Sequence, residues 1–110
     1  MPLLFSYGTF QKKQVQLATF GRLLHGEKDC LPNYRLAFIE ITDTDVLRKS
    51  GEKLHPIIRH SQNPYDKVKG VLFEVTFDEI LAADHYEVVA YKKIETVFES
   101  GKGGFIYIER

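Results

Sequence analysis

The stretch LFSYGTF, residues 4–10, joins an apolar run to a polar one near the amino end of the chain. Residues 2–7 are mostly apolar and contain no glycine, which is typical of a short buried strand. Gly8 ends that run, and residues 11–20 continue without glycine or proline as far as Gly21, which favours a helix. The turn at Gly8 either merely connects these two elements or presents backbone N–H groups to a ligand.

Most of the chain beyond this stretch has the composition of strands. We expect strands over residues 23–31, 35–42, 68–76 and 91–99 and over the closing FIYIE, which pairs with the strand before it. The link Pro32-Asn33-Tyr34 predicts a hairpin or an adjacent pair between the first two. LHPIIRH, residues 54–60, contains a proline and therefore belongs on an edge strand or at a bulge if it is a strand.

A second helix is predicted in TFDEILAADHYE, residues 76–87, with Thr76 or Asp78 as its N-cap. The polar residues 43–53 are expected to form a loop. Six or seven strands and two short helices place the chain in the α+β class. Curling the strands into a small mixed β-barrel, with the helices packed alongside, would leave few exposed strand edges.

Length and charge restrict the function. A chain of 110 residues is expected to form a single domain over residues 1–110. Fifteen basic and fifteen acidic residues are interspersed, which argues against nucleic acid or a membrane surface as partner. Cys30 is the single cysteine, we find no secretory leader, and no apolar run approaches the roughly 20 residues of a membrane span. We expect a cytoplasmic protein; oligomeric state cannot be read from the sequence.

Few residues are candidates for chemistry on spacing alone. Asp84 and Glu87 share one helix face near its carboxyl end, where the helix dipole disfavours negative charge, so they are either solvated or held for a purpose. His55 and His60 point to opposite faces of a strand, which is wrong for two ligands of one metal ion. Cys30 shows no partner base and is expected to pack as a small apolar residue.

The order of these segments resembles the gamma-glutamylcyclotransferase-like family, including its small AIG2-like branch and the gamma-glutamylamine cyclotransferases. The resemblance rests on Tyr-Gly-Thr after the first strand and a following helix, then NYRLAF, HPIIR and VKGVLFEV, then Asp-x-x-Glu-x-x-x-Tyr at 84, 87 and 91, and FIYI. It covers nearly the whole chain.

The resemblance implies which residues form the site. The backbone N–H groups of Tyr7, Gly8, Thr9 and Phe10 would hold the carboxylate of a gamma-glutamyl substrate, as a tight turn before a helix can. Glu87 falls on the family's catalytic acid, Asp84 on its aspartate and Tyr91 on its tyrosine, and Tyr107 would contact the substrate by analogy. Val88 stands where the family usually has glycine, and Lys93 where it usually has arginine.

The implied reaction is cyclisation of a gamma-glutamyl amine or peptide to 5-oxoproline with release of a free amine. One carboxyl group, Glu87, could take a proton from the attacking amine and return it to the leaving amine if burial raises its pKa. Neither a cofactor nor a metal is called for.

Two other functions stay open. The same domain could bind a small carboxylate ligand without turnover, which the valine at position 88 would favour. A metal-dependent hydrolase that uses the four histidines has little support in the sequence.

Overall fold

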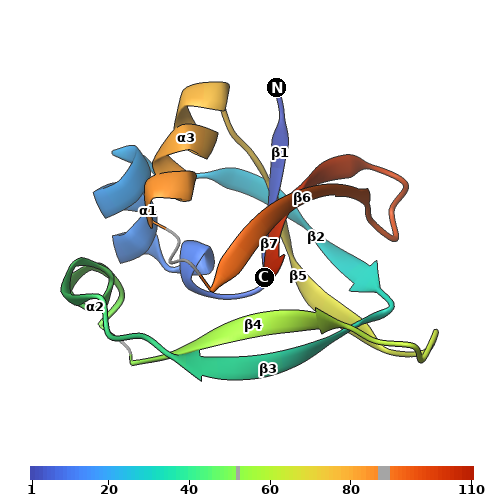
Figure 1. Cartoon of the computed structure of the whole chain (residues 1–110). Helices are drawn as coiled ribbons and strands as arrows, with labels where there is room; N and C mark the ends of the chain where they lie inside the picture. The colour runs from blue at the N-terminus through green and yellow to red at the C-terminus, as the bar shows by residue number, and fades with distance from the viewer. Residues whose placement is uncertain (52, 87–89) are drawn as a thin grey trace.

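The computed structural model describes residues 1–51, 53–86 and 90–110, and within them seven strands and three α-helices form (Figure 1). In chain order the elements are β1 (Leu3–Ser6), the 3-10 turn η1 (Thr9–Gln11), α1 (Lys13–Phe20), β2 (His25–Pro32), β3 (Tyr34–Glu40), α2 (Thr44–Ser50), β4 (Leu54–His60), β5 (Lys67–Glu74), α3 (Phe77–Tyr86), β6 (Tyr91–Val97) and β7 (Gly103–Glu109). None of these helices is long and apolar enough to cross a membrane.

The strands form two sheets. The larger has the order β2-β5-β1-β7-β6, with β1 antiparallel to β5 and parallel to β7. The smaller contains β3 and β4 and lies beneath the larger sheet in the view of Figure 1. The α+β class and the mixed sheet are confirmed, but the closed barrel is wrong. The described strands of the larger sheet end at β2 and β6 without pairing to each other, because the chain leaves this sheet after β2 to build the second one.

The predicted pairing across Pro32-Asn33-Tyr34 is also wrong. β2 pairs with β5 and β3 pairs with β4, so this link is a corner between the two sheets. Asn33 takes the left-handed conformation there, with φ of 69°. Its N–H donates to the carbonyl of Asp66 at 2.8 Å, and its carbonyl accepts from the N–H of Ser61 at 2.7 Å. These bonds bring residues from two loops together and explain why a turn signal does not produce a hairpin.

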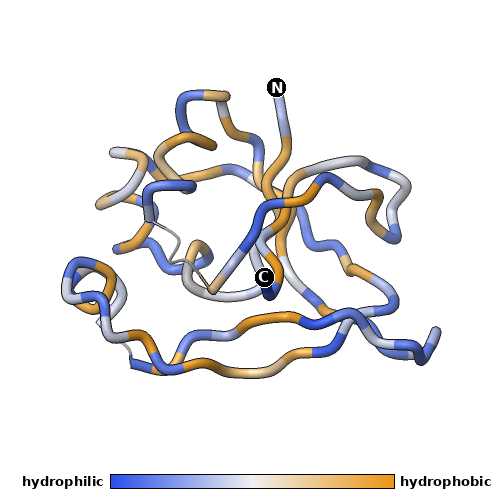
Figure 2. The backbone as a smooth tube through the Cα atoms, viewed as in Figure 1, coloured by the Kyte–Doolittle hydropathy of each residue, from blue (hydrophilic) through white to orange (hydrophobic). Residues whose placement is uncertain are grey.

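β1 is buried on both faces, as the sequence predicts. Because successive side chains of a strand point to opposite faces, Leu4 packs in one apolar cluster with Val15 and Ile80, and Phe5 packs in another. The ring of Phe5 stacks on that of Phe98 with centroids 4.6 Å apart. Figure 2 shows hydrophobic colour along β1 as it runs through the middle of the molecule. β1 thus links two cores and fixes the position of the turn that follows it.

α1 follows that turn and ends where the sequence predicts. Gly21 is left-handed, with φ of 71°, and its N–H donates to the carbonyl of Leu17 at 3.0 Å. The buried face of α1 includes a polar residue, because Leu17 is half exposed while Gln16 is buried. The Gln16 side chain donates to the carbonyl of Phe10 at 2.7 Å and accepts from the N–H of Leu24 at 2.9 Å. A polar residue therefore fills this core position because both ends of its amide are satisfied.

Residues 43–53 are not a loop, because α2 forms within them. The carboxylate of Asp43 accepts from the N–H groups of Asp45 and Val46 at 2.9 and 3.2 Å, which is an N-cap. Gly51 closes the helix in the left-handed conformation with φ of 73°. The polar composition concealed a short helix whose two caps are visible in the sequence.

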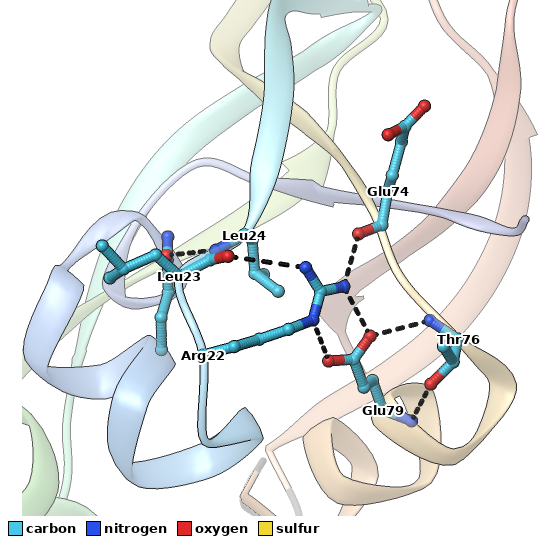
Figure 3. Close-up of polar contacts among 7 residues, drawn as sticks. Arg22, Leu23, Leu24, Glu74, Thr76 and Glu79 are labelled. Carbon is cyan, nitrogen blue, oxygen red and sulfur yellow. Dashed lines mark hydrogen bonds and ion pairs between the residues drawn. The ribbon is translucent and has the colours of Figure 1, made fainter.

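The amino end of α3 is held by a compact polar cluster (Figure 3). Thr76 and Glu79 form a reciprocal capping box, in which the N–H of each bonds to the other's side chain at 2.9 and 3.1 Å. Two guanidinium nitrogens of Arg22 donate hydrogen bonds to the two carboxylate oxygens of Glu79 at 2.7 and 2.8 Å. Arg22 also donates to the carbonyl of Glu74 at 3.2 Å. The hydrogen bonds from Arg22 lower the pKa of Glu79. Of the two predicted N-caps, Thr76 is the one used.

Candidate functional site at the end of the first strand

A small cavity lies where β1 ends. Its volume is about 20 Å³, room for about one water-sized group. Five residues that the sequence predicts for the site line it: Tyr7, Gly8, Phe10, Tyr91 and Tyr107. The other lining residues are Phe5, Ser6 and Pro56. Thr9, also predicted, begins η1 between Gly8 and Phe10. Residues from both ends and from the middle of the chain therefore meet at this point.

Close packing against β4 requires glycine at position 8. A Cβ atom there would lie 2.3 Å from Cγ of Pro56, which is closer than carbon atoms can approach. The proline of β4 therefore forms the wall opposite the Tyr7–Phe10 turn. Pro56 was not among the predicted site residues; it lies within the HPIIR segment of the resemblance, but nothing in the sequence places it against Gly8.

Two carbonyl groups of the turn, and that of Ser6 just before it, are already hydrogen-bonded. The Gln11 side chain donates to the carbonyl of Ser6 at 2.7 Å, and the Gln11 N–H donates to the carbonyl of Gly8 at 3.0 Å. The carbonyl of Phe10 accepts from Gln16. Among the N–H groups of the turn, that of Gly8 donates to the hydroxyl of Ser6 at 3.4 Å, at the long end of hydrogen-bond distances. A tight turn with its Gly8 and Phe10 carbonyl groups already occupied can present N–H groups to an anionic ligand such as a carboxylate.

The three tyrosines connect the cavity walls to one another. Tyr7 donates its hydroxyl hydrogen to the carbonyl of Tyr107 at 2.7 Å, and Tyr91 donates to the carbonyl of Pro56 at 2.7 Å. The hydroxyl of Tyr107 donates to one carboxylate oxygen of Asp84 at 2.5 Å. The other oxygen of Asp84 pairs with Lys93 at 2.8 Å. Asp84 is thus joined to the cavity through Tyr107, and Lys93, in place of the family's arginine, is its ionic partner.

Glu87 and Val88 lie outside the described residues, so the predicted general acid/base stays a prediction. The described residues on both sides of this segment lie at or beside the cavity. The ring of Tyr86, at the end of α3, lies 5.1 Å from that of Phe10, and Tyr91, at the start of β6, lines the cavity.

The histidines of β4 have local roles. His55 is buried and hydrogen-bonded to the hydroxyl of Ser50 at 3.0 Å, while His60 packs edge-on against the ring of Tyr34. Across residues 1–51, 53–86 and 90–110, no three His, Cys, Asp or Glu side chains gather in an arrangement that could hold a metal ion.

Comparisons with known proteins identify the architecture. The family model described as gamma-glutamyl cyclotransferase, AIG2-like, matches residues 4–108. A solved gamma-glutamyl cyclotransferase superposes with a TM-score of 0.75 at 19% identity, over 99% of this chain and 66% of its own. An Arabidopsis thaliana protein solved in solution gives 0.69 at 24% identity, over 98% of this chain and 68% of its own.

The same fold also occurs inside a larger enzyme. Kluyveromyces lactis allophanate hydrolase superposes with a TM-score of 0.73 at 15% identity, over 99% of this chain but 17% of its own. At these identities the solved structures establish the fold alone. The chain spans about two thirds of the length of the cyclotransferase it matches. No curated protein sequence is similar enough to count as a match.

Proposed function

We propose, because the chain belongs to the AIG2-like gamma-glutamyl cyclotransferase family, that it converts a small gamma-glutamyl amine or peptide into 5-oxoproline and a free amine. The observation that carries this proposal is the cavity at the end of β1. Tyr7, Gly8 and Phe10 meet Tyr91 and Tyr107 there, although up to about a hundred residues separate them along the chain. A turn that only connected β1 to α1 would not require this convergence.

The turn supplies the binding half of the proposed site. The substrate's α-carboxylate would accept hydrogen bonds from the backbone N–H groups of residues 7–10. The carbonyl groups of Gly8 and Phe10 are already occupied by Gln11 and Gln16. α1, which begins shortly after the turn, adds the positive end of its dipole. The tyrosine hydroxyls hold the surrounding walls in place, because each bonds to a different segment.

Glu87 would supply the proton transfers. The neutral α-amino nitrogen bonds to the γ-carbonyl carbon, and the bond from that carbon to the leaving nitrogen then breaks. The proton removed from the attacking nitrogen passes through Glu87 to the leaving nitrogen, so the carboxyl group ends as it began. The nucleophile belongs to the substrate, and its fixed proximity to the carbonyl raises its effective concentration. The protein therefore needs neither a nucleophilic side chain nor a cofactor for this route.

The cavity as it stands is too small for the proposed substrate. Space for about one water-sized group cannot contain a gamma-glutamyl group, so the walls must separate when substrate binds. A second candidate function, a domain that binds a small carboxylate ligand without turning it over, would require the walls to separate less. The cytoplasmic location expected from the sequence, and the expectation that neither nucleic acid nor a membrane is a partner, stay predictions.

The test is release of 5-oxoproline from a panel of gamma-glutamyl amines and dipeptides. We expect the wild-type chain to release it and Glu87→Gln to release at least about 100-fold less, the usual contribution of general acid/base catalysis. Glu95→Gln is the matched control, because Glu95 is exposed on β6 away from the cavity. Equal activity of Glu87→Gln and wild type would remove the proposed role of Glu87. A melting temperature raised by 5-oxoproline, with no product from any substrate, would favour the binding domain.

A further inference from the structure

A second and much larger cavity, of about 640 Å³, lies over the paired strands β2 and β5. Its lining residues include Lys28, Asp29, Cys30, Lys69, Val71 and Glu99, and none of them lines the cavity at the end of β1. Its size falls within the range of sites that bind small organic molecules. The proposed cyclisation assigns no role to it.

The strand register brings two lysines to this cavity. Lys28 lies opposite Val71, and Cys30 lies opposite Lys69, so these four side chains share one face of the β2–β5 pair. The lysines occupy diagonal positions, with their Cβ atoms roughly 7 Å apart. Neither ammonium group has a hydrogen bond or an ion pair with the described residues. This face of the β2–β5 pair therefore carries two exposed positive charges at neighbouring positions.

The acidic residues of the cavity are already satisfied. Asp29 accepts hydrogen bonds from the hydroxyl of Ser100 at 2.5 Å, from the N–H of Ser100 at 3.2 Å and from the N–H of Cys30 at 2.8 Å. Partial burial acts to raise the pKa of Asp29, but these bonds outweigh it and the pKa is lowered. Glu99 pairs with Lys67 at 3.3 Å. The charge that remains available to a ligand in this cavity is positive.

We propose that this cavity binds a small organic dicarboxylate, with one carboxylate on Lys28 and the other on Lys69. Its carbon chain would lie over Val71 and the backbone of Gly70. Lysines act as separate point charges, so two lysines on different strands suit two separated carboxylates better than a single phosphate, for which paired arginines or a nest of N–H groups would be expected. This binding does not depend on the proposed cyclotransferase activity, since the two cavities share no lining residue.

Cys30 provides the measurement, because it is the single cysteine of the chain and lines the cavity. The rate of its alkylation by iodoacetamide is followed with glutarate as the probe. Glutaramide, which has the same length and no charge, is the comparison ligand. We expect about 10 mM glutarate to slow alkylation about threefold, as mass action predicts for a Kd near 5 mM, and glutaramide to leave the rate unchanged. The protection should weaken at high salt.

Two double variants distinguish a specific role of Lys28 and Lys69 from an effect of the overall charge of the protein. Lys28→Gln with Lys69→Gln should lose the protection, and Lys13→Gln with Lys92→Gln, which removes the same charge from exposed positions elsewhere, should keep it. Equal protection by glutaramide, or equal protection in both double variants, would overturn the proposal. So would an unchanged alkylation rate together with unchanged amide resonances of Gly70 and Val71 in glutarate titrations of the wild-type chain, a result that does not depend on any variant folding.

Discussion

At its amino end, α3 is held by Thr76, Glu79 and Arg22, and at its carboxyl end Asp84 is held by Tyr107 and Lys93. The first arrangement follows the ordinary rules of helix stability, because an acid and a hydroxyl cap the positive end of the dipole. The second opposes them, because an acid lies near the negative end. Asp84 is thus unfavourably placed with respect to the helix dipole, yet Tyr107 and Lys93 both bind it, and Tyr107 lines the candidate cavity. We therefore expect Asp84 to serve function rather than stability.

The comparison predicts that changes at the two ends of α3 have different consequences. Substitutions at the carboxyl end should reduce turnover more than stability. Substitutions at the amino end should reduce stability and leave the turnover of the folded protein unchanged.

Of the substitutions at the two ends of α3, Asp84→Ala is expected to have the largest effect. It leaves the hydroxyl of Tyr107 and the ammonium of Lys93 without their shared partner. Tyr107 then loses its fixed orientation in the cavity wall, and we expect the barrier to 5-oxoproline release to rise by about 2 kcal/mol, so that kcat falls about 30-fold. Stability should change less, because removing an acid from the negative end of the helix returns about 0.5 kcal/mol.

Asp84→Asn refines this test, because it keeps an acceptor for Tyr107 but loses the ion pair with Lys93. A fall in kcat smaller than that of Asp84→Ala would assign the effect to the orientation of Tyr107. If both variants kept wild-type kcat, the carboxyl end of α3 would have no role in turnover.

Tyr107→Phe should have a smaller effect. It keeps the ring in the cavity wall and removes one hydroxyl, so we expect kcat to fall about 10-fold. Loss of the hydrogen bond to Asp84 should cost about 1 kcal/mol of stability and lower the melting temperature by about 5 °C. Tyr34→Phe is the matched control, since Tyr34 packs against His60 and does not line the cavity. Parallel losses in both variants would argue for a general effect of removing tyrosine hydroxyls.

Thr76→Ala tests the amino end of the helix. Loss of the cap costs about 1 kcal/mol and should lower the melting temperature by about 5 °C, while kcat of the folded protein stays at the wild-type value. Thermal unfolding and 5-oxoproline release measure the two quantities on the same sample. A loss of kcat without a loss of stability would contradict the assignment of stability to the amino end of α3 and turnover to its carboxyl end.

The smallest effect is the acid sensitivity of the same cluster. Because hydrogen bonds from Arg22 lower the pKa of Glu79 in the folded chain, this carboxylate contributes stability above its ordinary pKa. That contribution is lost as pH falls through the ordinary value toward the lowered one. The melting temperature of wild type should therefore drop more than that of Glu79→Gln between about pH 5 and about pH 3. Parallel pH dependence in the two proteins would mean that Arg22 does not perturb Glu79.

The sequence predicts elements better than their pairing. β1, its turn and the end of α1 follow from the apolar run and from the glycines at positions 8 and 21, which are local signals. The hairpin at Asn33 and the barrel were wrong because strand partners depend on contacts distant in sequence, here with β5 and β4. α2 could have been found, since Asp43 and Gly51 are ordinary caps, but its polar residues suggested a loop.

The candidate site was predictable through the family pattern rather than from residue chemistry. Spacing alone indicates Asp84 and a turn at Gly8, but it cannot bring Tyr91 and Tyr107 to that turn. Pro56 was missed because its contact with Gly8 forms only when β4 folds under β1. The hydrogen-bond partner of Asp84 could not be predicted either, because it is Tyr107, 23 residues further along the chain.

The most direct test of the proposed site is a crystal structure of the chain with 5-oxoproline bound. We predict that its carboxylate accepts hydrogen bonds from the N–H groups of Gly8, Thr9 and Phe10, and that the carboxyl group of Glu87 lies within hydrogen-bond distance of its ring nitrogen. A Glu87 side chain that points into solvent, away from the bound 5-oxoproline, would contradict the proposal.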